Sequence, residues 1–286
     1  MTHVGPPEME IRYIRVAMDG RVALSFVLGL IVSAGVVHAA DHPALALIER
    51  GAAAVRTDPE AMRRDAEAAL ALIAKQPDAD LEIRARLLLC DYQSERDRAA
   101  AESEIARATT LLPGAKRQAL RSGILVCQGE TLEANGQNAE ARSHYEEAVS
   151  VASAAEDDEM LANALFSRGY VLGLQGEYAL GLADLRRSQS IFERLDMPSH
   201  ALTALNGIAI LYNRMGDFVQ ARNMYERALV EQVREGMRRE QAVTHHNLGR
   251  AHENLHDWAA ARRSFERSYE ITIWRSEERR VGKECR

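Results

Sequence analysis

The sequence predicts an all-α fold in which pairs of antiparallel helices repeat along the chain to form a solenoid. Three observations predict it: small residues recur every 40 residues, bulky apolar residues recur in phase with them, and turn residues recur between the two. Fixed periods of roughly 20 to 50 residues are typical of stacked repeat architectures. The sequence therefore indicates a scaffold with a binding surface and does not name its partner.

Three of the recurring columns hold only glycine, alanine or serine. The first contains Gly129, Gly169, Ala209 and Gly249, the third Ala141, Gly181, Ala221 and Ala261, and the fifth Ala148, Ser188, Ala228 and Ser268. Small side chains are required where two helix backbones approach closely. The fourth column contains Tyr145, Leu185, Tyr225 and Phe265. We expect these large apolar groups to fill the space left between neighbouring repeats.

The second column marks a turn and contains Gly136, Gly176, Gly216 and His256. Gly176 and Gly216 are each followed by an acidic residue, which is typical of a helix C-terminal glycine next to the start of another helix. His256 replaces the glycine in the last copy, while Asp257 keeps an N-capping residue there. We therefore expect a variant of the same turn at this point.

These columns resemble the tetratricopeptide repeat family, whose signature pairs Leu-Gly with a Tyr three residues on, then a turn Gly, then Ala, an aromatic residue and Ala. The third copy matches through Tyr212, Gly216, Ala221, Tyr225 and Ala228, and the fourth has Leu248-Gly249 with Ala261 and Phe265. The departures are a period of 40 residues instead of 34 and the polar residues Gln128 and Arg168 in place of Leu248. Six extra residues lengthen each helix by about three residues, as in long-helix variants from bacterial signalling proteins. The resemblance implies a right-handed superhelix.

The repeats are predicted to occupy residues 81–274. A fainter copy carries Leu89, Tyr92, Ala101 and Ala108 in phase, with Arg96 in place of the turn glycine. Residues 41–80 read as a degenerate helical pair in which Asp58-Pro59 starts the second helix. We expect this pair to cap the solenoid, because one face of an end repeat meets water.

The first 40 residues are predicted to be a secretory signal peptide. Arg12, Arg15 and Arg21 precede an apolar run over 22–37, which small residues and then Asp41 follow. We expect cleavage after Ala39 or Ala40 and export to the periplasm or to the periplasmic face of the inner membrane. The alternative is an uncleaved membrane anchor, for which 16 apolar residues fall just short of the roughly 17 to 25 that span a bilayer.

The last twelve residues, 275–286, form a charged string without an apolar period. This string resembles the translation of a widely used sequencing-adapter oligonucleotide, so we predict a non-native tail. The alternative is a natural charged tail.

Composition and motifs argue against several classes of function. The formal net charge is -6 and no basic stripe is present, which gives no support to nucleic-acid binding. No glycine-rich phosphate loop or nucleophile elbow occurs, so we expect no cofactor and no enzyme activity in this chain. Cys90 and Cys127 lie 37 residues apart on different repeats, and we expect two buried thiols rather than a disulfide.

One motif looks catalytic. The segment His252-Glu253-Asn254-Leu255-His256 fits the H-E-x-x-H pattern of zinc peptidases, and His245 and His246 lie nearby. The pattern needs a continuous helix, whereas His256 occupies the turn column. We therefore expect repeat packing here and no metal site.

The first helices of successive repeats are expected to line a concave groove where ligands lie. Helical spacing selects nine partner-binding candidates: Asn163, Phe166, Tyr170, Asn206, Ile210, Asn213, His246, Arg250 and Glu253. Asn side chains can hold a peptide backbone, Arg can take a carboxylate, and the two aromatic rings offer an apolar anchor. The family's carboxylate clamp of paired Lys and Asn is absent. For each residue the alternative is an ordinary solvated or half-packed helix position.

Two hypotheses about function follow. The first is an exported scaffold that binds a protein or peptide partner, but no nucleic acid, through its groove. The second is the sensory region of a truncated signalling enzyme. Its order of leader and repeats is similar to that of bacterial tetratricopeptide-linked diguanylate cyclases, in which a membrane helix and a GGDEF domain follow. In either case, membrane contact is expected only through the leader or a missing downstream helix.

Overall fold

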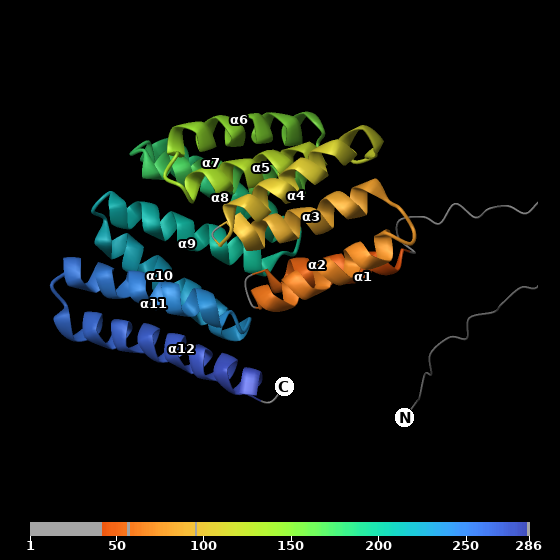
Figure 1. Ribbon diagram of the computed structural model, residues 1–286. Coiled ribbons are helices and arrows are strands. Elements are labelled where there is room, and N and C mark those ends of the chain that lie inside the picture. Colours follow the sequence, from red (N-terminus) through yellow and green to blue (C-terminus); the bar gives the residue numbers. More distant parts are fainter. Residues whose placement is uncertain (1–41, 56–57, 95, 285–286) are drawn as a thin grey trace, which may run out of the picture. The chain divides into compact units, whose positions relative to one another are not determined.

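The computed structural model describes residues 42–55, 58–94 and 96–284, and within them it contains twelve α-helices. The helices are α1 Pro43–Ala54, α2 Pro59–Ile73, α3 Ala79–Ser94, α4 Arg98–Leu111, α5 Leu120–Glu133, α6 Asn138–Ala154, α7 Asp158–Leu174, α8 Tyr178–Arg194, α9 Pro198–Arg214, α10 Phe218–Arg234, α11 Arg238–Asn254 and α12 Trp258–Glu284 (Figure 1). The prediction of an all-α repeat fold is confirmed for these residues. The predicted leader, 1–40, lies outside them, and α12 continues through most of the predicted tail.

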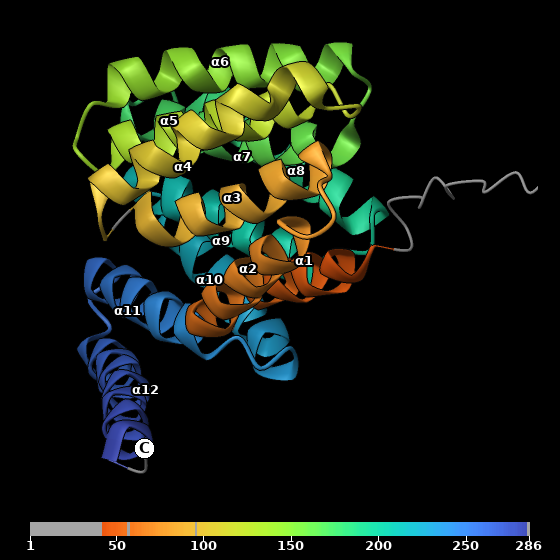
Figure 2. The same ribbon diagram turned by 45° about the vertical axis from the view of Figure 1, so that its right-hand side comes forward.

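Consecutive helices pack as adjacent pairs, from α1 with α2 to α11 with α12 (Figures 1 and 2). The odd-numbered first helices of neighbouring pairs also contact each other, as α3 does with α5 and α5 does with α7. Within the described residues, the even-numbered second helices make no comparable contacts with one another. This asymmetry leaves the first helices on one side of the stack, where side chains from several repeats can meet.

The small-residue columns lie where helix backbones approach one another. A Cβ atom placed on Gly181 of α8 would lie 2.7 Å from the carbonyl oxygen of Gly169 in α7. A Cβ on Gly249 would lie 2.6 Å from the ring of Phe265, and one on Gly129 would collide with the ring of Tyr145. The sequence interpretation of these columns as steric requirements is therefore confirmed.

The fifth column also carries a hydrogen bond that was not predicted. Ser188 donates its hydroxyl to the carbonyl oxygen of Ala162 at 2.7 Å, and Ser268 donates to that of Ala242 at 2.7 Å. In an earlier copy the serine stands on the opposite helix, where Ser122 donates to the carbonyl oxygen of Ala148 at 2.9 Å. All three pairs are separated by 26 residues. The hydroxyl thus joins the two helices of a pair at the point where the column keeps side chains small.

The turn column adopts the left-handed backbone conformation that favours glycine. His256 has φ 60°, beside φ values of 76°, 87° and 83° at Gly136, Gly176 and Gly216. The amide of Asp257 donates to the carbonyl oxygen of His252 at 2.9 Å, closing the same type of turn as in the sister repeats. The expectation that the last copy is a variant of the same turn is confirmed. The carboxylate of Asp257 also caps α12, since it accepts from the amide of Ala260 at 3.0 Å.

A second turn series, between successive pairs, was not predicted. Glu156, Asp196 and Gly236 have φ values of 52°, 55° and 68°, and they too are 40 residues apart. Only the last of them is a glycine. The residue types hide the series, because Glu and Asp do not indicate a left-handed backbone conformation as glycine does.

The expectation of two free thiols is wrong, because Cys90 of α3 and Cys127 of α5 form a disulfide with their Cα atoms 6.4 Å apart. The two cysteines are 37 residues apart, which is shorter than the repeat period of 40 residues by about one helical turn. Residues one period apart lie at the same level of adjacent first helices. A sequence separation close to one period therefore places the two cysteines next to each other on adjacent first helices.

Arg117 connects two repeats through a charged cluster. Its guanidinium donates to both carboxylate oxygens of Asp157 at 2.7 and 2.8 Å and to Glu159 at 2.9 Å. Asp157 is the N-cap of α7 and accepts from the amide of Met160 at 3.1 Å. Burial raises the pKa of Asp157, but the hydrogen bonds from Arg117 and from the Met160 amide outweigh it and lower that pKa overall.

We predict that Gly181→Ala lowers the free energy of unfolding by about 1 to 3 kcal/mol, because its methyl group meets a backbone oxygen that cannot move aside alone. Urea denaturation followed by circular dichroism measures the loss. Gly114→Ala is the matched control, since its nearest atom is the Ala79 side chain at 3.7 Å. Equal stability of the Gly181→Ala variant and the wild type would contradict the close approach.

We predict that Asp157→Asn destabilises the protein at pH 7 and that the deficit shrinks as the pH falls. The folded-state pKa of Asp157 is lowered, so its ion pair stabilises the fold above the unfolded-state pKa of about 3.9. That stabilisation is lost as the pH falls through the folded-state pKa. Asparagine keeps the N-cap, which isolates the charge.

Denaturant unfolding at pH 7 and at about pH 3 measures this effect. Asp158→Asn is the control, because the carboxylate of Asp158 is 48% exposed and pairs with an exposed Arg194; we expect a smaller deficit. A deficit in Asp157→Asn that is the same at both pH values would refute the assignment.

Candidate functional site

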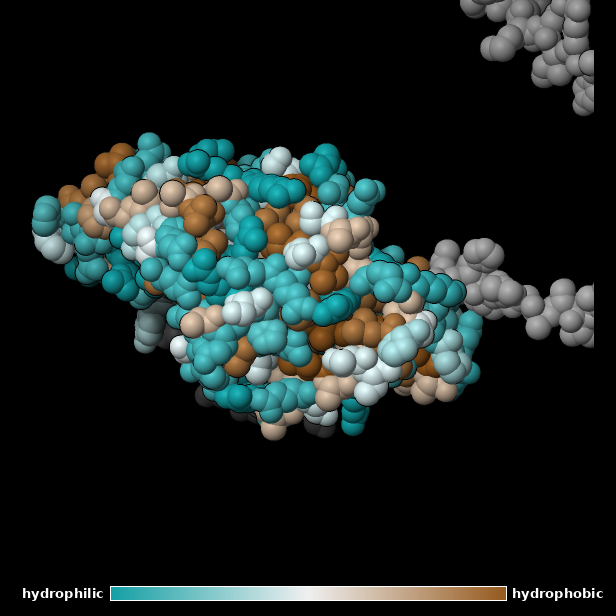
Figure 3. Space-filling view, turned by 90° about the horizontal axis from the view of Figure 1, so that it is seen from above, coloured by the Kyte–Doolittle hydropathy of each residue, from teal (hydrophilic) through white to brown (hydrophobic). Residues whose placement is uncertain are grey.

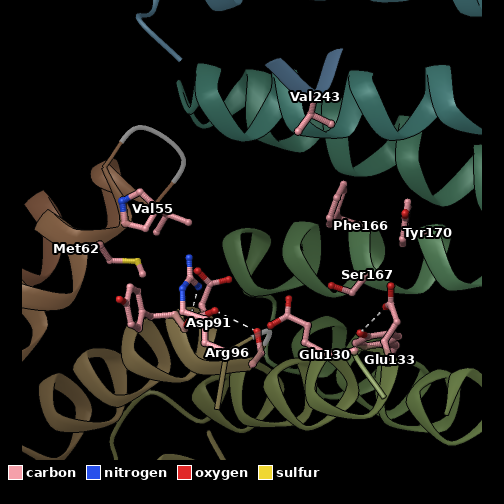
Figure 4. A pocket seen from close by; sticks show the side chains of 15 residues that line it. Val55, Met62, Asp91, Arg96, Glu130, Glu133, Phe166, Ser167, Tyr170 and Val243 are labelled. Carbon is pink, nitrogen blue, oxygen red and sulfur yellow. Dashed lines mark hydrogen bonds between the residues drawn. The ribbon is translucent and has the colours of Figure 1, made fainter. Parts of the chain in front are cut away.

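The first helices border two adjoining cavities, with volumes of about 420 and about 180 Å³. Side chains from α2, α3, α5, α6, α7 and α11 line the larger cavity, and side chains from α1, α3, α5, α7 and α9 line the smaller one. Figure 4 shows the larger cavity with Phe166 and Tyr170 on one side and Asp91, Glu130 and Glu133 along another. We call these two cavities together the groove.

Seen from above, the surface is largely hydrophilic, with hydrophobic side chains exposed in separate patches (Figure 3). In the groove, apolar groups face the cavity from different helices. Val55 and Met62 come from α1–α2, Phe166 from α7 and Val243 from α11. Residues that are far apart in the sequence thus line a single hollow.

Three of the nine predicted partner-binding residues line the groove. Phe166 and Tyr170 border the larger cavity and Asn163 the smaller one. The two aromatic rings are stacked, with centroids 6.5 Å apart and an interplanar angle of 14°. The side-chain amide of Asn163 donates to the carbonyl oxygen of Glu159 at 3.1 Å, so one of its hydrogen atoms is already used within α7.

The other six predicted residues line neither cavity. On α9, Asn206, Ile210 and Asn213 are half-buried. The amide oxygen of Asn206 accepts from Thr244 at 3.4 Å, while that of Asn213 is buried without a hydrogen bond in the described part of the chain.

The three on α11, His246, Arg250 and Glu253, are exposed. The ring of His246 lies 5.4 Å from that of Phe265, on the neighbouring helix α12. In place of these three residues, α11 contributes Val243 to the groove.

The carboxylates of the groove were not predicted from the sequence. Asp91, Glu130 and Glu133 line the larger cavity, where Arg96 is the one basic side chain among the described lining residues. Glu130 precedes Tyr170 by one period of 40 residues. Extending the groove columns back by one repeat would therefore have found it.

The groove's charged and phenolic groups are partly held by local interactions. The guanidinium carbon of Arg96 lies 4.3 Å from the centroid of the Tyr92 ring, and its Nη1 donates to the Tyr92 carbonyl at 2.5 Å. Tyr145 donates its hydroxyl to Glu133 at 3.0 Å. Burial, and then the negative charges of Glu130 and Glu133, raise the pKa of Tyr145, so its phenol stays neutral.

The H-E-x-x-H segment does not form a zinc-binding helix face. Helix α11 ends at Asn254, and His256 lies in the turn beyond it with φ 60°. The expectation that the pattern straddles a helix end is confirmed. Among the described residues, no group of three or more His, Cys, Asp or Glu side chains is placed to hold a metal ion.

Among the described residues, no helix is both long enough and apolar enough to cross a membrane. The predicted leader, residues 1–40, lies outside these residues.

Residues 160–229 match the tetratricopeptide repeat family. No curated protein matches the sequence significantly. The structure of BtubC from P. vanneervenii is similar, with a TM-score of 0.58 and 21% identity, over 81% of this chain and 92% of that one. These matches agree with the predicted repeat fold.

Two further structures are similar to this chain and contain bound partners. A Rap protein complexed with Competence and Sporulation Factor has a TM-score of 0.62 and 13% identity, over 80% of this chain and 65% of that one. NprR in complex with its cognate peptide NprX has a TM-score of 0.59 and 14% identity, over 79% and 67%. At these identities the likeness shows the fold alone, and this chain spans about two thirds of either protein.

Proposed function

We propose that this chain, in which residues 160–229 match the tetratricopeptide repeat, is an exported scaffold that binds a protein or peptide partner through its groove. The observation that carries the proposal is the stacked pair of Phe166 and Tyr170, two half-buried rings that face a cavity of about 420 Å³. Aromatic side chains in such positions supply most of the binding energy of many interfaces.

The structural likenesses support the same proposal. Rap and NprR, which share the repeat fold, hold Competence and Sporulation Factor and the peptide NprX, respectively. A groove lined by first helices is also the usual ligand surface of solenoids. By analogy we assign a polypeptide ligand to this chain.

Export is supported by two independent features. The first 40 residues have the order of a secretory leader. The Cys90–Cys127 bridge adds a second argument, because disulfides persist in oxidising compartments and are rare in the cytosol. We therefore propose a periplasmic location, or one on the periplasmic face of the inner membrane.

We predict that a photo-crosslinker at Tyr170 captures a partner in an extract of the native cell envelope, whereas one at Tyr269 does not. Tyr269 of α12 is the matched control, since it is 67% exposed and lies outside the groove. Mass spectrometry identifies the crosslinked segment, and adding Phe166→Ala should reduce the adduct because it removes half of the anchor. Adducts of equal yield at both positions would argue against a groove ligand.

We predict that the full chain, expressed in a Gram-negative host, is recovered from the periplasm with Ala40 or Asp41 as its first residue. Cys90 and Cys127 should resist alkylation until a reductant is added. Intact-mass measurement with and without reduction tests both points: one alkyl group, on Cys285, is expected before reduction and three after it. A chain lacking residues 1–40 is the cytosolic control. A product that keeps its leader and takes up three alkyl groups without reduction would contradict the proposed export.

A further inference from the structure

The apolar groups of the groove are arranged to hold one bulky side chain. Val243 of α11 faces Phe166 of α7, while Val55 and Met62 lie across the cavity from them (Figure 4). These groups belong to three different helix pairs. A side chain that enters between them is enclosed from several directions, so its apolar surface is removed from water.

The polar part of the same cavity is acidic. Asp91 extends from α3, and Glu130 and Glu133 extend from α5, so three carboxylates face one guanidinium among the described lining residues. That guanidinium, of Arg96, is stacked on Tyr92. The smaller cavity shares Asp91 and Glu130 and adds Arg84 and Glu159, of which Glu159 is already paired with Arg117. The balance of charge therefore stays negative along the groove.

The negative charges of these carboxylates create an electrostatic field that shifts the pKa of a neighbouring group. The charges of Glu130 and Glu133 help raise the pKa of Tyr145, next to the contribution of burial. Field lines are focused in a cleft with low-dielectric walls, which strengthens the attraction of a cation. An acidic ligand would be repelled by this field, because Arg96 is the single basic side chain among the described residues that line the larger cavity.

We propose that the groove binds a cationic segment of polypeptide, in which one bulky apolar side chain contacts Phe166 and Tyr170 and an adjacent Lys or Arg faces Asp91, Glu130 and Glu133. The inference rests on the proposed function and specifies the chemistry of its ligand. A cavity of about 420 Å³ accommodates a few side chains, which is the size of a short linear motif. The apolar contact provides affinity, and the carboxylates select the charge of the flanking residues.

Three fluorescent peptides test the proposal against the full chain. Each has the same Phe-Leu centre, flanked on both sides by two Lys, two Ser or two Glu residues, and fluorescence anisotropy gives its Kd. We expect the Lys peptide to bind at least about tenfold more tightly than the Glu peptide. Its affinity should fall as the salt concentration rises.

Variants separate the charge of the groove from its apolar anchor. Asp91→Asn combined with Glu130→Gln should weaken binding of the Lys peptide by about tenfold and leave the Ser peptide almost unchanged. Glu140→Gln, at an exposed position of α6, is the matched control and should change nothing. Circular dichroism establishes that each variant keeps its helices.

Phe166→Ala separates failure of this inference from failure of the proposed function. If the Ser or Glu peptide binds as tightly as the Lys peptide and still depends on Phe166, the charge selection is wrong while the groove remains a ligand site. If no peptide binds in a way that depends on Phe166, both the inference and the proposed function fail.

Discussion

The close approach of two helix backbones within each pair is the constraint on which the rest of the structure depends. In α7 and α8 the contact is made at Gly169 and Gly181, where any larger side chain would meet a carbonyl oxygen or a side-chain carbon. Helices that touch through their backbones have little freedom to slide or tilt. Each pair is thus a nearly rigid unit, and similar units stack in similar ways.

Contacts between units then determine the groove. The first helices of successive pairs touch each other, and the Cys90–Cys127 bridge makes one of these contacts covalent. Cys127 itself lines the smaller cavity, so the bridge restrains the wall on which a ligand would lie. A restrained wall loses less conformational entropy when a ligand binds. The same junctions that stabilise the stack therefore also prepare its binding surface.

The parts of this fold that could be predicted are those that depend on local repetition. Glycine is the residue type expected at a close helix contact, as at Gly181, and in a left-handed turn, as at Gly216. The helix pairs and their turns could therefore be predicted from the sequence. Glu156 and Asp196 occupy equally special backbone conformations, but nothing in their residue type indicates it. The position of Val243 across the cavity from Met62 could not be predicted, for another reason. It results from small rotations added up over several repeats, and no single segment encodes that sum.

The aromatic anchor shows how packing and binding share one side chain. The Cε2 atom of Phe166 lies 3.5 Å from the point where a Cβ on Gly207 of α9 would stand, an ordinary contact distance, so the edge of the ring packs against α9 at this residue. Phe166 also packs against the core cluster of Leu182 and Leu185. One part of the ring is held by the next repeat while it also lines the cavity. A ring immobilised in this way presents apolar area at low entropic cost. The packing of α7 against α9 and α8 thus also holds the anchor of the groove.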